Sequence, residues 1–571
     1  MPLPTSLADS GPRRRFNRAD TIAADESLTP PRMSDAKGPR QEWIVLAVVC
    51  GFLFFYGLGA FGLVGADEPR YAQVAREMLE RGDWVTPTLG HQPWLEKPAL
   101  LYWEEMIAFR IFGVSDWAAR VPSAYSALLM IVTIYLFLRR FRPGAELDGA
   151  LMTASGAAVI GFARAAGTDM PLAANFTMGL LAWYSWYESQ ERRWLIVASA
   201  FLGLATLAKG PVAGAFFVLI VVAFAAVRSD WRLITRTLWL PGIAAYCVVT
   251  LPWFVAVQWR NPEFFRVFIL EHNLARFGTS LYRHQQPFWY FLVVALIGLL
   301  PWTIFTIAAM ADTVRGWKAE GRRIFGGEDA FDVFLLLWLA VPIIFFSFSQ
   351  SKLPGYILPA LPAAPILVAS FVRRRTSSGL TVSRATVVLH AIFAGILVMP
   401  CFLISYIVLV HRLPWGMGTL AAGVLSLVTA VMIVITLSGR FGLRLLHFST
   451  LIPVVLSVAA LIRLGGPAID EENSARPVAA ALALAEAGGT SPLPIAVFQT
   501  PRQTEYGLAF YRNQIVESYD RGEIPEGAHL LVTKEGAQSD VVKVVGSRVV
   551  TLIGANPAQH LEYYRVSGAS R

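Results

Sequence analysis

Long apolar runs separated by short polar segments dominate the hydrophobic pattern of this chain. An apolar run of about 17–25 residues is long enough to cross a bilayer as a helix. Thirteen runs are expected as membrane spans: 43–64, 117–138, 147–163, 169–187, 193–209, 211–227, 238–258, 288–309, 331–349, 355–372, 384–411, 417–437 and 443–462. The least distinct are 147–163 and the pair 193–209 and 211–227, which only Lys209-Gly210-Pro211 separates. The pattern predicts an α-helical polytopic membrane protein.

The longest loop, 65–116, carries two shorter stretches with helical periodicity. Apolar residues recur at helical spacing from Pro69 to Arg81 and again from Pro98 to Phe112. This spacing is typical of amphipathic helices, and the nearby tryptophans suit the boundary between membrane and water. We therefore expect two helices that lie on the membrane surface.

The pattern changes after residue 462. Residues 477–484 read as a helix that ends at Gly488-Gly489. Apolar, β-branched segments at 495–498, 515–519 and 529–533 predict strands, and 541–545, 549–552 and 563–566 are further candidates. The sequence thus predicts a small α/β domain over 463–571, called the C-terminal domain below.

Composition and charge agree with this division. Charged residues make up 16% of the chain, against about 25% in an average soluble domain. The net charge of +9 comes largely from Lys and Arg in the N-terminal tail and in alternate loops, at 139–142, 192–193, 228–236, 315–323, 373–375 and 440–444. The positive-inside rule places these segments in the cytoplasm. The charge therefore reports topology and implies no nucleic-acid partner.

The expected organisation follows from this orientation. Residues 1–42 form a disordered cytoplasmic tail, and 43–462 form a transmembrane catalytic domain. Loops 65–116 and 257–287 and the C-terminal domain face the outer side. The three cysteines, Cys50, Cys247 and Cys401, all lie in apolar runs and form no disulfide or metal-binding pattern.

Ionisable residues gather at the outer ends of the spans. They are Asp67, Glu68, Arg70, Glu96, Lys97, Arg164, Asp169, Lys209, Glu271, His272, Arg276, Arg283, His284 and Lys352. Ionisable residues at that depth are costly and point to function. Because they come from several loops but from one side, we expect a single site in a membrane-embedded enzyme that handles a charged, phosphate-bearing lipid.

Several of these residues also have a purely structural interpretation. Asp67 and Asp169 each stand where a helix N-cap is expected, and Lys209 could extend its ammonium to the interface. Glu96 and Lys97 could form an exposed pair of little energetic value. Lys352 precedes a break at Pro354-Gly355, and non-helical backbone at this depth is tolerated where it lines a cavity.

Five short motifs together resemble those of bacterial aminoarabinose transferases, which are similar to protein O-mannosyltransferases and share the GT-C membrane fold. The motifs are Asp67-Glu68-Pro69-Arg70-Tyr71, Glu96-Lys97-Pro98, Thr168-Asp169-Met170-Pro171, Lys209-Gly210-Pro211 and Lys352-Leu353-Pro354-Gly355-Tyr356. In motif order the resemblance covers about residues 40–460. Each motif alone is weak, and the combination is specific.

The resemblance implies an inverting glycosyltransferase of the bacterial inner membrane. It would move 4-amino-4-deoxy-L-arabinose from undecaprenyl phosphate to a lipid A phosphate on the periplasmic face, a lipopolysaccharide modification that gives polymyxin resistance. We expect a monomer that requires no cofactor, with a divalent metal as an option.

Roles for individual residues follow from the same resemblance. Asp67, Asp169 and Lys97 would be catalytic. The residues expected to hold the donor phosphate are Lys97, Arg70, Arg283, Lys209, Lys352 and Tyr356; those expected to bind substrate are Glu68, Glu96, Tyr71 and Arg276; and the optional metal would be bound by Glu96, His272 and His284.

Two alternatives remain. The same fold could transfer another sugar, such as mannose, to protein or to another envelope acceptor, which would require an Asp as base. A transporter for a lipid-linked sugar is disfavoured, because transporters show inverted repeats and charges at the membrane midplane.

Overall fold

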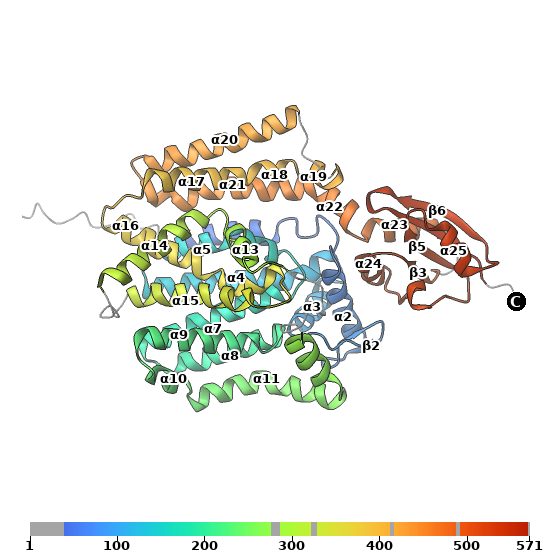
Figure 1. The fold of residues 1–571 in the computed structure, drawn as a ribbon, viewed down its shortest axis with the longest axis horizontal. Helices are drawn as coiled ribbons and strands as arrows, with labels where there is room; N and C mark the ends of the chain where they lie inside the picture. Colours follow the sequence, from blue (N-terminus) through green and yellow to red (C-terminus); the bar gives the residue numbers. More distant parts are fainter. Residues whose placement is uncertain (1–38, 276–285, 321–327, 411–415, 487–491, 569–571) are drawn as a thin grey trace, which may run out of the picture. The chain divides into compact units, whose positions relative to one another are not determined.

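The computed structural model describes residues 39–275, 286–320, 328–410, 416–486 and 492–568 (Figure 1). Helices dominate up to residue 486. Their bounds are α1 Pro39–Cys50, η2 Gly51–Phe55, α2 Asp67–Arg81, α3 Leu100–Phe112, α4 Asp116–Phe141, α5 Glu146–Ala154, α6 Ala157–Ala163, α7 Asp169–Ser189, α8 Arg193–Lys209, α9 Val212–Arg228, α10 Arg232–Thr237, α11 Leu240–Arg260, η3 Phe265–Ala275, α13 Tyr290–Gly298, α14 Thr303–Glu320, α15 Glu328–Ser347, η5 Pro354–Ala360, α16 Ala363–Ser377, α17 Arg384–Ile396, α18 Val398–Phe402, α19 Ile404–Val410, α20 Met417–Ser438, η6 Gly442–Leu445, α21 Leu446–Ala460, η7 Leu461–Gly465, α22 Gly466–Asn473 and α23 Arg476–Ala485.

Seven of the predicted spans are single helices with nearly the predicted bounds: α4, α7, α8, α9, α11, α15 and α20. Among the described residues, six helical stretches are long and apolar enough to cross a membrane, or eight if each bent pair counts as one span. The structure thus supports a multi-span helical protein, while the number thirteen stays a prediction.

Other predicted spans are interrupted. The run 147–163 is split between α5 and α6 at Ser155-Gly156, and 384–411 is split into α17, α18 and α19. The two halves of the 288–309 run, α13 and α14, meet at 111°. The run 355–372 begins as the 3₁₀ turn η5 and bends by 40° into α16. Hydropathy alone does not register such breaks, because the residues around them remain apolar.

The doubtful pair 193–209 and 211–227 forms two separate helices. α8 ends at Lys209, Gly210 adopts φ +106, and α9 begins at Val212. A positive φ suits glycine, and here it lets the chain turn back, so that α9 packs against α8.

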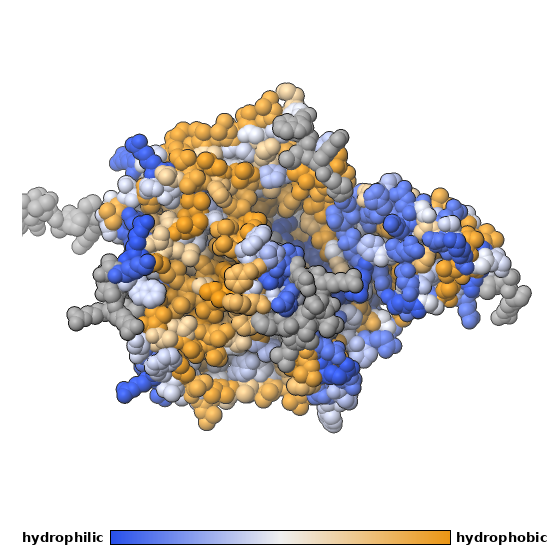
Figure 2. Space-filling model, viewed as in Figure 1, coloured by the Kyte–Doolittle hydropathy of each residue, from blue (hydrophilic) through white to orange (hydrophobic). Residues whose placement is uncertain are grey.

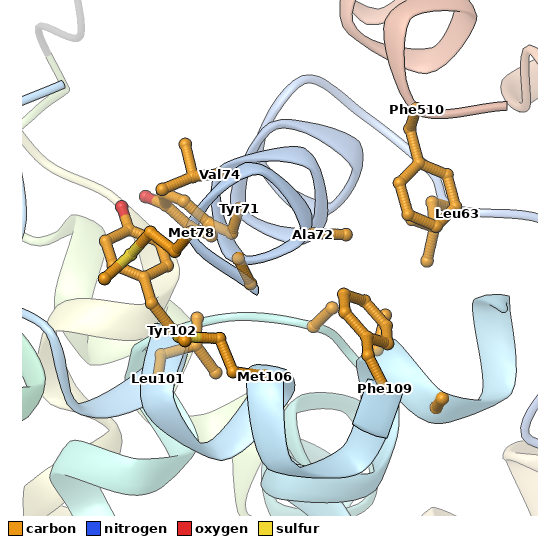
Figure 3. Close-up of a cluster of buried hydrophobic side chains, with 14 residues drawn as sticks. Leu63, Tyr71, Ala72, Val74, Met78, Leu101, Tyr102, Met106, Phe109 and Phe510 are labelled. Atoms are coloured by element: carbon orange, nitrogen blue, oxygen red, sulfur yellow. The ribbon is translucent and has the colours of Figure 1, made fainter. Parts of the chain in front are cut away.

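Helices α2 and α3 form at the predicted positions and pack on each other (Figure 3). Tyr71, Ala72 and Met78 of α2 are buried against Tyr102 and other residues of α3. The expectation that α2 lies on the membrane surface is wrong, because its apolar residues are covered by α3 and by the C-terminal domain. On α3, by contrast, Ile107, Ile111 and Phe112 are at least half exposed, as an interfacial helix would require.

The C-terminal domain contains a five-stranded mixed sheet of order β4-β3-β5-β7-β6. The elements are β3 Ile495–Phe498, α24 Arg502–Arg512, β4 Val516–Ser518, η8 Tyr519–Arg521, β5 His529–Lys534, α25 Gln538–Val545, β6 Val550–Asn556, η9 Pro557–Gln559 and β7 Leu561–Val566. Strand β3 runs parallel to β4 and β5, whereas β7 runs antiparallel to β5 and β6. All four residues of β3 are buried, because helices cover both faces of the sheet.

Five of the six predicted strands are confirmed, and the predicted strand at 541–545 is wrong. This segment is part of α25, in which Val541 and Val545 are buried one turn apart while Val542 and Val544 are exposed. Burial with a period near 3.6 is helical. The clustered valines suggested a strand because β-branched residues favour sheets.

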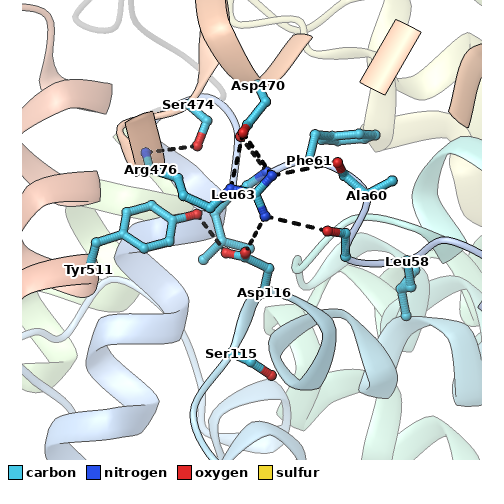
Figure 4. Close-up of polar contacts among 12 residues, drawn as sticks. Leu58, Ala60, Phe61, Leu63, Ser115, Asp116, Asp470, Ser474, Arg476 and Tyr511 are labelled. Atoms are coloured by element: carbon cyan, nitrogen blue, oxygen red, sulfur yellow. Dashed lines mark hydrogen bonds and ion pairs between the residues drawn. The ribbon is translucent and has the colours of Figure 1, made fainter. Parts of the chain in front are cut away.

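Polar contacts join the C-terminal domain to the helical part (Figure 4). Arg476 forms ion pairs with Asp116 at the start of α4 (3.0 Å) and with Asp470 (2.7 Å). The Tyr511 hydroxyl donates a hydrogen bond to Asp116 (2.5 Å) and accepts one from the backbone N–H of Leu63 (2.7 Å). These contacts fix the loop that leads into α2.

The surface divides as the composition predicts. Figure 2 shows apolar side chains over the helical part and hydrophilic side chains over much of the C-terminal domain. Basic residues at the helix ends opposite that domain pair with acidic ones, as in Arg140–Glu191 (3.2 Å) and Arg142–Glu188 (2.6 Å). The apolar surface between these two ends is the part suited to lipid.

Candidate active site

A cavity of about 390 Å³ lies where α2, α7, α8, α9, α15 and η5 approach one another. Its charged residues come from four of the five sequence motifs, and most of its apolar residues come from α7, α9 and α15. The lining comprises Asp67, Arg70, Tyr71, Glu96, Lys97, Asp169, Leu172, Lys209, Pro211, Val212, Ala215, Phe216, Phe268, Phe345, Phe346, Ser349, Ser351, Leu353, Gly355 and Tyr356. Three carboxylates and three cations thus meet an aromatic wall, and the fifth motif adds Gly355 and Tyr356.

The first turn of α2 supplies Asp67, Arg70 and Tyr71. Gly65 adopts φ +67 and Pro69 lies in the first turn, so the helix starts sharply at Asp67. Asp67 is not the N-cap, which is Ala66 and has no capping side chain. Instead Asp67 accepts a hydrogen bond of 2.5 Å from Arg70. The side chain of Asp67 remains 65% exposed, so its second oxygen is accessible from the cavity.

The guanidinium of Arg70 is surrounded by aromatic rings. Its Cζ lies 5.2 Å from the ring centre of Tyr71, 5.1 Å from that of Trp94 and 5.6 Å from that of Tyr506. One Nη lies 4.0 Å from Glu96. Burial opposes the charge of Arg70, but the neighbouring Tyr71, Asp67 and Glu96 outweigh burial and raise its pKa above the ordinary value. Arg70 therefore stays a cation inside the cavity.

Lys97 reaches the cavity from the bend before α3. Its Nζ donates a hydrogen bond of 3.3 Å to the backbone carbonyl of Glu96. Glu96 itself is only 24% exposed. The two residues are therefore not the exposed turn pair of the structural interpretation, and both line the cavity.

Asp169 and Lys209 face each other across the start of α7 and the end of α8. Their Oδ1 and Nζ atoms are 2.5 Å apart, and the two side chains are 22% and 17% exposed. Thr168, not Asp169, is the N-cap of α7 and makes no capping bond. The Lys209 Nζ also lies 5.3 Å from the ring centre of Tyr356. Lys209 is thus held in the cavity by a carboxylate and a ring.

Gly355 lies directly against Asp169. A Cβ at position 355 would be 2.7 Å from the Asp169 Cγ, closer than atoms can approach. The break before η5 therefore needs a glycine, so that the backbone can approach the carboxylate. This gives the Pro354-Gly355 pair of the fifth motif a physical role.

An aromatic wall closes the other side of the cavity. The ring of Phe216 lies 5.3 Å from that of Phe345 and 5.2 Å from that of Phe346, which lies 4.9 Å from Tyr356. Phe268 belongs to the same lining. The wall is apolar and the opposite side is ionic, so the cavity suits an amphiphile with a charged end.

Four of the ionisable residues expected at the site lie in the described part of the chain but outside the cavity: Glu68, Arg164, Glu271 and Lys352. Glu271 pairs with Arg266. Glu68 is buried and binds Arg120 (2.7 Å), and it accepts hydrogen bonds from the N–H groups of Val64 (2.7 Å) and Ala166 (2.8 Å). Lys352 donates to the carbonyl of Ser349 (2.6 Å). Arg164 donates to two backbone carbonyls near the end of the first helix. Glu68, Lys352 and Arg164 hold the backbone around the site.

Some of the predicted site residues lie in parts of the chain whose side chains the structure does not describe. Arg276, Arg283 and His284 lie outside the described residues, and for His272 only the backbone is described. Within the described ranges, no three His, Cys, Asp or Glu side chains are grouped as a metal site. The optional metal site at Glu96, His272 and His284 therefore stays a prediction.

Sequence reasoning missed Arg120, Trp94, Tyr506 and the phenylalanines of the wall. Arg120 lies inside a predicted span, where its rarity could have marked it as a partner for a carboxylate. Nothing in the sequence points from Tyr506 to Arg70, since 436 positions separate them in the numbering.

Known proteins resemble this chain in sequence. The family description of dolichyl-phosphate-mannose-protein mannosyltransferase matches residues 43–268. An undecaprenyl phosphate-alpha-4-amino-4-deoxy-L-arabinose arabinosyl transferase of Pseudomonas aeruginosa is 32% identical over 343 residues, 59% of this chain and 60% of the relative. A transferase of the same name from Yersinia pestis is 33% identical over 53% of this chain and 54% of its own length. The resemblance predicted from the motifs is confirmed.

The solved structures extend the comparison to the fold. ArnT from Cupriavidus metallidurans bound to undecaprenyl phosphate has a TM-score of 0.73 at 22% identity, covering 93% of this chain and all of ArnT. An Archaeoglobus fulgidus oligosaccharyltransferase has a TM-score of 0.50 at 13% identity, covering 84% of this chain and 63% of its own. This chain therefore shares the fold of ArnT. The chain spans about three fifths of the length of the curated relatives it matches.

Proposed function

We propose that this protein transfers 4-amino-4-deoxy-L-arabinose from undecaprenyl phosphate to a lipid A phosphate, with inversion at the sugar. The observation that carries the proposal is the cavity in which Arg70, Lys97 and Lys209 face an aromatic wall. A polyprenyl-phosphate sugar has the matching chemistry, with an anionic phosphate joined to a long apolar tail. The transferases of Pseudomonas and Yersinia that resemble this chain name the same sugar and the same undecaprenyl phosphate carrier.

The main chemical task in this reaction is to stabilise the departing undecaprenyl phosphate. Negative charge on that phosphate increases as the bond to the sugar breaks. Preorganised cations in a site with little water lower the barrier for such a step. We assign this role first to Lys97, because an ammonium is a compact charge suited to phosphate, with Arg70 and Lys209 in support.

The two aspartates have a different task. A phosphate acceptor is already anionic, so its attack on the sugar needs no strong general base. Asp67 and Asp169 would instead orient the acceptor or hold the amine of the sugar. Their pairing with Arg70 and Lys209 keeps both carboxylates in place before substrate arrives.

A second candidate function is transfer of a sugar to protein or to another envelope acceptor. The mannosyltransferase family match over residues 43–268 favours it. In that reaction a hydroxyl attacks, so Asp67 or Asp169 would have to accept a proton. The identity of the acceptor therefore separates the two functions.

Mass spectrometry of lipid A from cells with and without this gene tests the proposal. We expect a mass increase for the added aminoarabinose only when the gene is present. Cells that express Asp169→Asn should lack the modification although the protein inserts normally, because asparagine keeps the size of the side chain and removes only the charge that pairs with Lys209. Asp540→Asn is a matched control, since Asp540 is exposed on α25 and pairs with Lys543. Unmodified lipid A together with glycosylated envelope protein would favour the second function.

We propose further that the cavity opens on the periplasmic side of the bacterial inner membrane and that the chain crosses it thirteen times as a monomer. Helices α8 and α9, at 17 residues each, would be about 25 Å long at 1.5 Å per residue. That length is slightly less than the hydrocarbon core of about 30 Å. Interrupted helices such as α5–α6 and α13–α14 would then count as broken spans.

A further inference from the structure

We propose that the C-terminal domain completes the active site through Tyr506, a positioning residue that holds the guanidinium of Arg70 toward the donor phosphate. This inference rests on the proposed function. It gives the domain a part in the reaction, which neither its sheet nor its sequence indicates.

The first observation is the set of rings around Arg70. Tyr71 belongs to α2, Trp94 to the loop before α3, and Tyr506 to α24 of the C-terminal domain, and all three ring centres lie within 5.6 Å of the Arg70 Cζ. A ring face attracts a cation and adds no formal charge. Rings can therefore hold an arginine in place without neutralising it. A further carboxylate would cancel part of the positive charge that attracts the phosphate.

The second observation is that Arg70 is confined without being fully hydrogen-bonded. Its side chain is 12% exposed, and its buried Nε has no hydrogen-bond partner within the described part of the chain. Asp67 binds one Nη at 2.5 Å, and Glu96 is 4.0 Å away. Packing against rings therefore contributes much of what fixes the orientation of the guanidinium.

The third observation is that α24 is anchored next to α2 independently of Tyr506. Phe510, one turn later, packs against Phe109 with ring centres 6.5 Å apart, and its carbonyl accepts a hydrogen bond from Arg76 (3.1 Å). Tyr511 binds Asp116 (2.5 Å). Since these contacts already dock the helix, removal of the Tyr506 ring should leave the domain in place and affect Arg70 alone.

The test uses the purified 571-residue chain with three substitutions. Tyr506→Leu removes the ring, Tyr506→Phe keeps it, and Arg502→Ala is a control at an exposed position of the same helix. Two quantities are measured for each variant: binding of undecaprenyl phosphate, and the KM and kcat for the undecaprenyl-phosphate-linked sugar.

We expect Tyr506→Leu to weaken undecaprenyl phosphate binding and raise the donor KM by about 5- to 30-fold, the range expected for one partly desolvated cation–π contact. Tyr506→Phe and the control should remain within about twofold of the parent, since both keep the ring. In an Arg70→Ala background, Tyr506→Leu should have no further effect, because the ring acts through the arginine.

Three results would overturn the inference: wild-type binding in Tyr506→Leu, failure of Tyr506→Phe to restore binding, or additive effects with Arg70→Ala. A parent protein that binds undecaprenyl phosphate but transfers no aminoarabinose would contradict the proposed function alone, and the binding comparison would still decide the role of Tyr506. A parent that does not bind undecaprenyl phosphate would overturn both.

Discussion

At the scale of single residues, the cations of the cavity differ in how they are held. Arg70 and Lys209 each bind an aspartate at 2.5 Å, and Lys97 donates a hydrogen bond of 3.3 Å to a backbone carbonyl. Lys97 lies in the lining of the cavity, and its ammonium is a compact charge suited to phosphate.

Lys97→Ala should lower the transfer rate by about 10²–10³-fold, the usual cost of losing one preorganised contact to developing charge. The measurement is turnover of purified protein at saturating donor, alongside thermal unfolding of the same preparation. Lys543→Ala is the control, since Lys543 is 75% exposed on α25. Near-normal turnover in a folded Lys97→Ala protein would exclude this role.

Gly355→Ala tests the approach of η5 to Asp169. A Cβ at this position would meet the Asp169 Cγ at 2.7 Å, so the carboxylate must shift, which disturbs its ion pair with Lys209. Misplacement of a catalytic group by about 1 Å can cost about 10²-fold in rate. We expect a loss of that order, measured as kcat/KM. Gly161→Ala is the matched control, because a Cβ there meets nothing within 4 Å; equal activity of the two variants would contradict the prediction.

The five sequence motifs contain most of the polar residues that line the cavity. The sequence does not show in which direction each of these side chains points. Asp67 and Glu68 are adjacent in one motif, yet Asp67 enters the cavity and Glu68 points toward Arg120. Successive residues on a helix differ in direction by about 100°, and only the fold shows which direction is occupied. For the same reason the rings around Arg70, drawn from three segments, could not be predicted.

At the scale of elements, α3 carries two adjacent carboxyl groups that the proposed reaction does not use. Glu105 is fully buried, and neither of its oxygens has a hydrogen-bond partner within the described residues. Burial raises its pKa well above the ordinary value, and the neighbouring Glu104 and Glu68 raise it further. Burial likewise raises the pKa of Glu104 to about 8.

The folded state holds the protons of Glu104 and Glu105 more tightly than the unfolded state does. The resulting contribution to the free energy of unfolding is therefore fully present below their unfolded pKa of about 4.5, and it is lost as the pH rises toward 8. Glu105→Gln should therefore flatten the decline in melting temperature between about pH 5 and pH 8. The variant should melt above the parent at pH 8. Glu526→Gln, at an exposed position, should behave like the parent. An unchanged pH profile for Glu105→Gln would mean that Glu105 is not protonated in the fold.

The elements that sequence reasoning described wrongly share one cause. Helix α2 was expected to face the membrane, and 541–545 was expected to be a strand, but α3, α24 and the sheet provide the covering surfaces. An apolar helix face indicates that something covers it, but it does not show whether the covering surface is lipid or another part of the protein. The predicted bounds of α4, α7, α8 and α9 were nearly correct, because length and end signals are local.

At the scale of the whole molecule, the order of the helices supports one orientation. α4 runs from Asp116, which binds the C-terminal domain, to Arg140, which binds Glu191 at the far end of α7. α8 returns from that end to Lys209, which pairs with Asp169. The cavity and the C-terminal domain therefore lie toward one end of these helices, and the basic clusters lie toward the other.

The final prediction concerns which side of the membrane each end faces. The positive-inside rule places the basic end in the cytoplasm, so the 65–116 loop and the C-terminal domain should both be periplasmic. A single helix over 193–227 would have placed every later loop on the opposite side of the membrane. The structure instead has two separate helices, α8 and α9, joined at Gly210. The donor would then have to be flipped across the membrane by another protein before use.

Single cysteines at exposed positions test this sidedness in a chain whose Cys50, Cys247 and Cys401 have been replaced. Gln92→Cys, in the 65–116 loop, and Ser539→Cys, in the C-terminal domain, should both react with an impermeant thiol reagent in intact spheroplasts. Ser378→Cys, just after the basic cluster at 373–375, should react only after permeabilisation. If Gln92→Cys is labelled in intact spheroplasts and Ser539→Cys is not, the two positions lie on opposite sides of the membrane. The chain would then cross the membrane an odd number of times between them, and the predicted topology would be wrong. Labelling of Ser378→Cys in intact spheroplasts would reverse the assignment of the basic end, and with it the requirement that the donor be flipped before transfer.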